Sequence, residues 1–389
     1  MPPQGHGATC CRDWDSLPVT TAAKPKSLLT LTNLVSFGLL LFVPLAVWAE
    51  HAEWDPLVVF AVSAIAIVPL AMWLSTATEE VAVVTGPSIG GLLNAVFGNA
   101  TELIIAVVAL KAGLVGVVKA SITGSLLANL LLVMGLSMLV GGIKYKEQEF
   151  ASIIARINGS TMTLAVTALV LPALLIQTSQ VVAPETIEHL SVTVAVVLLV
   201  VYILTLVFSL KTHSYLYDVG VEDLEIDPAA DEHAEKPNLW LWVGVLLTAT
   251  LGVAFVSEIF VAALEEATAT LGFTELFSGV ILVPLVGGAA EYLTAVRVAA
   301  KNNMDLAVSI SMGSSLLVAL LIVPVLVLVG QAIGQPMDLN FNLFEVVAVI
   351  IAVALVNLIS LDGRSNWLEG VLLLATFVIL GTAFYFHPV

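Results

Sequence analysis

Long apolar stretches separated by short polar segments make up most of the chain. A hydrocarbon core about 30 Å thick is crossed by roughly 20 apolar residues in a helix. The pattern predicts about eleven transmembrane helices, over residues 28–48, 57–74, 85–110, 117–140, 153–176, 190–210, 239–264, 276–300, 306–329, 343–360 and 368–386. We therefore expect an all-α polytopic membrane protein, because a helix satisfies its backbone hydrogen bonds internally within the bilayer.

Composition agrees with this fold class. Of the 389 residues, 59% are hydrophobic and only 11% are charged, and the mean hydropathy is +1.05. A soluble core of this size does not need so many apolar residues. The first stretch lacks a small-residue cleavage site, so it predicts a retained helix and not a signal peptide. Cys10 and Cys11 are adjacent and are the only cysteines, so no disulfide framework is expected.

The positions of lysine and arginine predict the orientation. These residues favour cytoplasmic loops. With the N-terminus inside, all 13 of them except Lys111 and Lys119 fall on the cytoplasmic side. The expected order is an N-terminal cytoplasmic segment (1–27), a first helix (28–48), a five-helix repeat (57–210), an acidic cytoplasmic loop (211–238) and a second five-helix repeat (239–389).

Two apolar segments each contain a carboxylate. Residues 98–102 read GNATE and end in Glu102, and residues 287–291 read GGAAE and end in Glu291. An ionisable group at bilayer depth costs about 2.5–3.5 kcal/mol or more, so each is a functional-site hypothesis. The difference in residue number between Glu102 and Glu291, here called the repeat offset, also relates the Gly-Ser pairs at 124–125 and 313–314 without a gap. A register shared over such a length predicts an internal repeat.

The two repeats are predicted to be inverted. Glu102 lies on the third helix, which runs outward, whereas Glu291 lies on the eighth, which runs inward. Inverted repeats build many transporters, whose ion sites lie near the midplane at interrupted helices. The residues expected to interrupt these two helices are Gly90, Gly91, Gly98, Pro284, Gly287 and Gly288. Close packing between helices is the alternative reason for small residues at these positions.

Two facing carboxylates suit a hard divalent cation. Ca²⁺ takes roughly 6–8 oxygen ligands from carboxylates, carbonyls, amides and water. The candidate ligands are Glu102, Glu291, Asn99, Gly98, Gly287, Ser125, Ser314, Ser315 and Asn129. Desolvation and mutual repulsion disfavour two bare charges, so the pair must hold protons or a cation. Competition between these occupants predicts proton-coupled antiport through Glu102 and Glu291, with Ca²⁺ and H⁺ as cargo and no cofactor.

Several motifs resemble a known family. GGLLNAVFGNATELI, VKASITGSLLANLLLVMGLS, FSLKTHSYL and VSEIFVAALEEATATLG are similar to the calcium/proton exchanger branch of the Ca²⁺/cation antiporter superfamily. The resemblance implies eleven helices, an acidic loop between helices six and seven, and a calcium site at the two repeat glutamates. It also implies a proton-coupling role for Glu258 within the pair Ser257-Glu258.

The second repeat departs from the pattern of this family. The chain has Gly288 where many members have asparagine, Tyr292 where they have histidine, and Leu317 where they have glutamine. Two amide ligands are thereby lost, which leaves cation affinity and selectivity open. At Gly288, a backbone carbonyl or a water molecule is expected to replace the missing asparagine amide as a ligand.

Other functions are alternatives to exchange with protons. Na⁺-coupled exchange is the alternative within carriers, and a cation channel is a rival from another class, because carboxylate rings also select cations. Ser88 lies in a hydrolase-like G-x-S-x-G pattern, but the six histidines fall outside the predicted helix interiors, so an enzyme is not expected. A prokaryotic inner membrane is the expected location, with the vacuolar membrane as the alternative. Lipid is an expected partner, nucleic acid is not, and a homo-oligomer is left open.

The acidic loop generates the first prediction. Its eight acids are Asp218, Glu222, Asp223, Glu225, Asp227, Asp231, Glu232 and Glu235. If they gather or sense calcium, replacing them by Asn and Gln should shift the dependence of transport on cytosolic Ca²⁺ modestly. Transport assays over a range of Ca²⁺ concentrations measure this. An unaltered response would leave the loop as a solvated linker.

Overall fold

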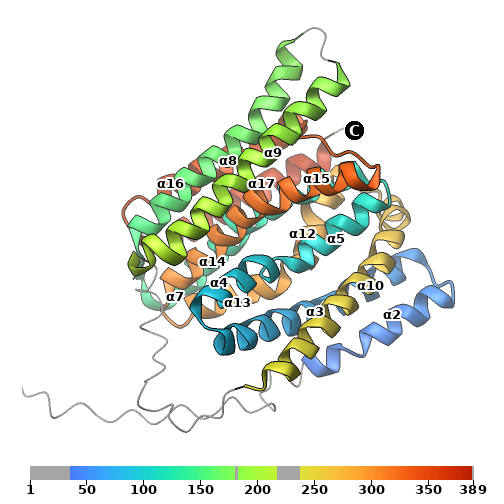
Figure 1. The fold of residues 1–389 in the computed structure, drawn as a ribbon, viewed down its shortest axis with the longest axis horizontal. Helices are drawn as coiled ribbons and strands as arrows, with labels where there is room; N and C mark the ends of the chain where they lie inside the picture. The colour runs from blue at the N-terminus through green and yellow to red at the C-terminus, as the bar shows by residue number, and fades with distance from the viewer. Residues whose placement is uncertain (1–35, 180–182, 217–236, 388–389) are drawn as a thin grey trace, which may run out of the picture.

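The computed structural model describes residues 36–179, 183–216 and 237–387, and most of them are helical (Figure 1). The N-terminal segment 1–27, the beginning of the first expected helix and the eight acids of the loop lie outside the described residues. The first half of the chain forms α2 (Phe42–His51), α3 (Pro56–Thr85), α4 (Pro87–Phe97), α5 (Ala100–Lys111), α6 (Val115–Leu127), η1 (Ala128–Val133), α7 (Met134–Tyr145), β1 (Glu147–Glu149), α8 (Ser152–Thr178), α9 (Pro184–Val207), η2 (Phe208–Thr212) and η3 (Ser214–Leu216).

The second half has a similar order of helices, but its strand lies one helix later and it has an additional π-helical turn, η5. It forms α10 (Leu239–Leu271), α11 (Glu275–Phe277), η5 (Ser278–Leu282), α12 (Val283–Gly287), α13 (Ala289–Ala299), α14 (Met304–Leu317), η6 (Val318–Ile322), α15 (Val323–Ile333), α16 (Leu343–Ile359), β2 (Arg364–Asn366) and α17 (Trp367–Phe386).

The repeat offset also relates the backbones of the two halves. Shifted by this offset, the first residue of α5, Ala100, coincides with the first residue of α13, Ala289. In the same way the start of α6 at Val115 coincides with the start of α14 at Met304. The π-helical turns η1 and η6 correspond as well, and their last residues coincide. The repeat read from the residues is therefore present in the local conformation.

The expected end of the second helix at residue 74 is wrong. α3 continues through the polar run after Leu74, because Thr76 and Thr78 donate their hydroxyls to carbonyls one turn back in the same helix. The helix ends only at Gly86, whose φ of +86° suits glycine and no other residue without strain. α4 begins directly afterwards with a proline at its first position, where proline is favoured.

Two expected helices are broken near their glutamates. The segment expected at 85–110 consists of α4 and α5, separated at Gly98 and Asn99. The segment expected at 276–300 breaks at Gly288, and its two parts are bent by 64°. Gly90 and Gly91 remain inside α4, where added Cβ atoms would meet Ala82 and Leu210. At these two positions the small residues serve helix packing.

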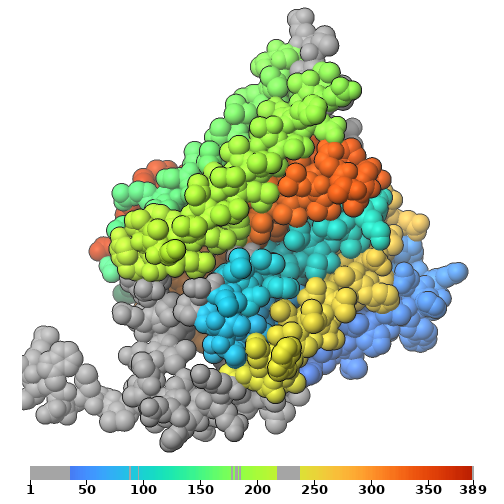
Figure 2. All heavy atoms as spheres, in the orientation of Figure 1, coloured from blue at the N-terminus to red at the C-terminus, as the bar shows by residue number. Residues whose placement is uncertain are grey.

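The described helices suit a membrane protein. By length and hydropathy, seven of them can cross a bilayer, or eight if the bent pair forms one span, and two shorter apolar helices cover Ser36–His51 and Leu343–Ile359. The count of eleven spans stays a prediction. Figure 2 shows α9 along the outside of the molecule, with the exposed apolar side chains Val196, Val197, Val200, Ile203 and Leu204. Such a surface fits contact with lipid.

Contacts at the helix ends show which loops lie on the same side of the helices. β1 follows α7 and pairs antiparallel with β2, which follows α16, so these two loops lie on one side. At another point Lys119, near the start of α6, pairs with Asp338 in the loop before α16. The long helices α3 and α10 run side by side near α2 (Figure 1). The rings of Phe60 on α3 and Phe260 on α10 are stacked with their centroids 4.9 Å apart.

Candidate cation site

Glu102 and Glu291 occupy the same position in two helices that begin at breaks. α5 begins directly after Asn99 and α13 directly after Gly288, and each glutamate is the third residue of its helix. The first turn of a helix leaves N–H groups without helical partners, and its partial positive charge stabilises a carboxylate by about 0.3–1 kcal/mol. The backbone therefore offsets part of the penalty for enclosing each charge.

The two breaks meet at the two glutamates. A Cβ atom on Gly287 would lie 2.9 Å from Cγ of Glu102 and 3.7 Å from its Cα, so glycine is needed for this close approach. Gly287 belongs to the segment that leads into Gly288 and α13, so the break that precedes Glu291 lies against Glu102. One carboxylate from each half of the chain thus lies in a shared region between the halves.

Polar atoms in this region are buried and lack partners within the described part of the chain. Oε1 of Glu102 is enclosed and accepts no hydrogen bond. The side chain of Asn99 neighbours Glu102 and is only 2% exposed, yet its Nδ2 has no partner of good geometry. Asn129, 1% exposed in η1, has an unpartnered Nδ2 as well. Buried polar groups are normally paired, so the neighbouring unpartnered atoms of Glu102 and Asn99 suit a place where water or an ion binds.

The candidate serines differ in what they contact. Ser314 on α14 donates its hydroxyl to Oε2 of Glu291 at 2.5 Å. Its counterpart Ser125 is buried in α6. Ser315 donates to the carbonyl of Ser311 in its own helix, at 2.9 Å, which leaves only its oxygen lone pairs for a cation. Of these three serines, Ser314 is the one that the structure joins to a glutamate.

Gly98 and Gly287, the two glycines predicted to supply backbone carbonyl ligands, lie at the breaks of the two helices. Gly98 and Gly287 end the helical segments that precede Asn99 and Gly288. Carbonyl groups at helix ends lack regular helical partners, so they are available to water or a cation. The structure thus brings both glycines to the ends of the segments that lead into the glutamates.

Glu258 lies apart from the enclosed pair. Its carboxylate is 61% exposed and lies 3.9 Å from Nζ of Lys111, which is 74% exposed. The preceding Ser257 is fully buried, with a hydroxyl that has no partner in the described residues. A role for Glu258 in proton coupling stays a prediction, and the present geometry makes it a surface ion pair of α10 with α5.

Sequence reasoning missed the contacts of Tyr292. Its hydroxyl donates to the carbonyl of Pro284 at 3.0 Å, across the break at Gly288. The sequence does contain one signal for a special contact here: position 292 is tyrosine, whereas the corresponding position 103 of the first repeat is leucine. Buried Glu345 was also missed; it caps α16 and accepts a hydrogen bond from Thr123 at 3.2 Å.

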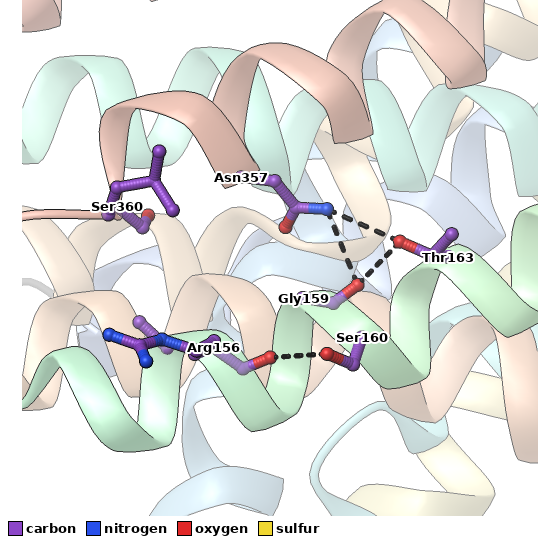
Figure 3. Close-up of a pocket in the computed structure, with 8 residues that line it drawn as sticks. Arg156, Gly159, Ser160, Thr163, Asn357 and Ser360 are labelled. Atoms are coloured by element: carbon purple, nitrogen blue, oxygen red, sulfur yellow. Dashed lines mark hydrogen bonds between the residues drawn. The ribbon is translucent and has the colours of Figure 1, made fainter.

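A separate cavity between α8 and α16 does not suit a cation. Its lining includes Arg156, Ser160, Thr163, Asn357 and Ser360 and no carboxylate (Figure 3). Asn357 donates to the carbonyl of Gly159 and to the hydroxyl of Thr163, so its amide joins the two helices. These bonds are the kind that hold transmembrane helices together.

Comparison with known proteins decides the family. The model of a family described as "Sodium/calcium exchanger protein" matches residues 56–211 and again residues 241–386. The chain belongs to the sodium/calcium exchanger protein family. Because one family model matches this exchanger twice, the match follows the same division into halves as the repeat offset.

Individual relatives align over nearly the whole exchanger. It is similar to the "Ca(2+)/H(+) antiporter" of Aphanothece halophytica, with 54% identity over 364 residues, 92% of this chain and 98% of the relative. It is 58% identical over 359 residues to the protein of the same name from Synechocystis, covering 90% of this chain and 96% of the relative. The solved structure of native YfkE matches with a TM-score of 0.78 and 39% identity, over 90% of this chain and 100% of that one.

The buried amide of Asn99 generates the second prediction. Its counterpart is Gly288, so no symmetric amide can replace it. Asn99→Ala should weaken Ca²⁺ binding at least about tenfold, equivalent to about 1.4 kcal/mol. Calcium titration of the purified protein measures this affinity.

Asn357→Ala is the matched control, because it removes a helix-joining amide far from the glutamates in sequence. It should lower thermal stability and leave Ca²⁺ affinity unchanged. An unchanged affinity in Asn99→Ala would remove this residue from the coordination shell.

Proposed function

We propose that this exchanger is a secondary active transporter that exchanges Ca²⁺ for H⁺ by alternating access. The observation that carries the proposal is the partly buried pair of Glu102 and Glu291, one from each half of the chain. Within the described residues neither glutamate forms an ion pair. Two partly buried like charges without a basic partner destabilise each other when bare, so they favour binding of protons or a cation.

The oxygen atoms around the pair suit Ca²⁺ as the transported ion. The cargo ion would be held by the carboxylates of Glu102 and Glu291, the amide oxygen of Asn99, the hydroxyl of Ser314 and backbone carbonyls at the breaks. Ca²⁺ accepts such mixed oxygen ligands, together with water, at about 2.3–2.6 Å. When both carboxylates hold protons, they no longer neutralise the cation and Ser314 keeps one of them in place. Binding of one cargo therefore expels the other.

The names of the relatives support protons as the counter-ion. Both cyanobacterial relatives are called Ca²⁺/H⁺ antiporters, and they share more than half of their aligned residues with this chain. Na⁺-coupled exchange is the alternative, since carboxylates bind Na⁺ too. Both relatives come from prokaryotes, and we expect this protein to act in a prokaryotic membrane, with Ca²⁺ and H⁺ as its cargo and without a cofactor or an enzymatic reaction.

An asymmetry between the repeats supports alternating access. A Cβ atom on Gly124 of α6 would collide with the carbonyl oxygen of Val280 and with Pro284, so these segments pack closely. The corresponding Gly313 of α14 has no atom of the described residues within 4 Å of such a Cβ. Its symmetry-related partner would be α4, where Gly91 packs against Leu210 instead. The two repeats are thus packed differently at this pair of glycines: the position of Gly124 is tight and that of Gly313 has room.

We expect the loosely packed position to lie on the side of the site that faces the cytoplasm. α4 precedes Glu102 on a helix that runs outward, and its apolar residues Ile89, Leu92 and Val96 are exposed. Figure 2 shows α4 at the surface beside the beginning of α10. If the repeats exchange conformations, α4 closes on α14 at Gly313 while α6 separates from Val280.

The third prediction tests the exchange itself. Proteoliposomes containing the protein should accumulate Ca²⁺ against its gradient when a H⁺ gradient is imposed, and not with a Na⁺ gradient alone. Glu102→Gln and Glu291→Gln should each abolish uptake and remain folded, because an amide neither titrates nor neutralises Ca²⁺ but costs less to bury.

Three outcomes would contradict the proposal. Uptake driven only by Na⁺ would favour the Na⁺-coupled alternative. Downhill Ca²⁺ flux that no proton gradient can drive uphill would indicate a channel. Substantial proton-coupled uptake by either glutamine variant would refute the mechanism based on two carboxylates.

The fourth prediction compares Gly124→Ala with Gly313→Ala. The methyl group at 313 has room here, so thermal stability should be unchanged, but it should obstruct the opposite state and slow exchange about tenfold, or about 1.4 kcal/mol. Gly124→Ala should lower both stability and exchange, because it collides in the present state. Gly313→Ala exchanging at the wild-type rate would contradict closure at this position.

A further inference from the structure

The ring of Tyr292 fills the space that a side chain at position 288 would need. A Cβ atom on Gly288 would collide with Cζ, Cε1 and the hydroxyl oxygen of Tyr292. Tyr292 is buried, and its ring belongs to an apolar cluster with Ala128, Val133 and Ala295. The first two of these belong to η1, so the ring is held between the two halves of the chain and cannot easily give way.

The hydroxyl of Tyr292 spans the break in the second repeat. It donates to the carbonyl of Pro284 at 3.0 Å, and the same carbonyl accepts the N–H of Gly288 at 2.9 Å. Pro284 belongs to α12 and Tyr292 to α13, whose helical segments are bent by 64°. A hydrogen bond across the bend therefore fixes the segment that carries Glu291 relative to the segment before the break.

The first repeat is built differently at the same positions. The repeat offset places Asn99 opposite Gly288 and Leu103 opposite Tyr292. There the break carries a buried amide beside Glu102, and leucine cannot donate a hydrogen bond across it. One repeat thus has an amide at its break, whereas the other has a phenol that excludes a side chain from this place.

We propose that Tyr292 is a positioning residue of the cation site. It occupies the amide position of the second repeat and holds the break through Pro284, so that Glu291 is fixed and Asn99 alone supplies an amide at the breaks. The site is thereby one-sided: the first repeat provides amide and carboxylate oxygen, and the second provides carboxylate and the hydroxyl of Ser314. This inference rests on the proposed Ca²⁺ site.

Tyr292→Phe removes only the hydrogen bond to Pro284. Because Glu291 is then held less firmly, Ca²⁺ affinity should fall about threefold to tenfold, with the maximal rate of exchange changing less. Tyr145→Phe is the matched control, since the Tyr145 hydroxyl donates to the carbonyl of Ala300 at 3.2 Å, at the loop end of α7. It should leave Ca²⁺ affinity unchanged.

Giving the second repeat the residues of the first tests whether the ring of Tyr292 excludes a side chain at position 288. Gly288→Asn alone should lose Ca²⁺ binding or fold poorly, because the asparagine collides with the ring. Tyr292→Leu should fold and bind Ca²⁺ weakly. The double variant Gly288→Asn/Tyr292→Leu should fold and bind Ca²⁺ about tenfold more tightly than Tyr292→Leu. Gly288→Asn is therefore expected to lower Ca²⁺ affinity when position 292 is tyrosine and to raise it when position 292 is leucine.

Calcium titration and thermal unfolding of all five variants and the wild type decide the result. The inference is overturned if Gly288→Asn binds Ca²⁺ like the wild type, if the folded double variant binds no more tightly than Tyr292→Leu, or if Tyr292→Phe matches Tyr145→Phe in affinity. A purely structural role would restore stability in the double variant without raising affinity. A wild type that binds no Ca²⁺ would instead contradict the proposed function.

Discussion

Two partly buried carboxylates held close together between the halves of the chain constrain the rest of this protein. Neither Glu102 nor Glu291 has an ion-pair partner in the described residues, and the two interact with each other. Like charges removed from water are unstable unless something neutralises them. The surrounding structure must offset part of this penalty and still let the neutralising ion leave, which is what an exchanger requires.

The broken helices meet both requirements. Because Glu102 and Glu291 lie in the first turns of α5 and α13, the unpaired N–H groups and the partial positive charge of each helix start lie near them. Gly287 then allows the two breaks to approach, since a side chain there would collide with Glu102. Gly124 likewise allows α6 to pack closely against η5. Around its counterpart Gly313, no atom of the described residues lies within 4 Å of an added Cβ atom. The repeats therefore share one architecture and differ in which side is packed.

Much of this arrangement could be predicted from the sequence, because the breaks in the helices need glycine and the site needs glutamate at fixed positions. Glycine, serine and glutamate recur at the repeat offset, and this was enough to predict the paired glutamates and the breaks near Gly98 and Gly288. The end of α3 could not be predicted, because the polar residues after Leu74 satisfy their hydroxyls inside the helix.

Other contacts depend on the three-dimensional packing. The bond from Tyr292 to Pro284 joins residues eight positions apart around a 64° bend, and no helical periodicity describes such a pair. A family motif likewise identifies Glu258 without stating which way its helix faces, and the structure places it on the surface beside Lys111. The π-helical turns η1 and η6 carry no recognisable signal in the sequence.

Proton release during Ca²⁺ binding tests the central claim most directly. Calorimetric titration of the purified protein with Ca²⁺, repeated in buffers of different ionisation enthalpy, counts the protons that leave as the cation binds. If one enclosed pair holds either cargo, Ca²⁺ binding must release protons, and their number must fall as the pH rises and the pair is already deprotonated. Ca²⁺ binding without proton release at every pH tested would contradict the account.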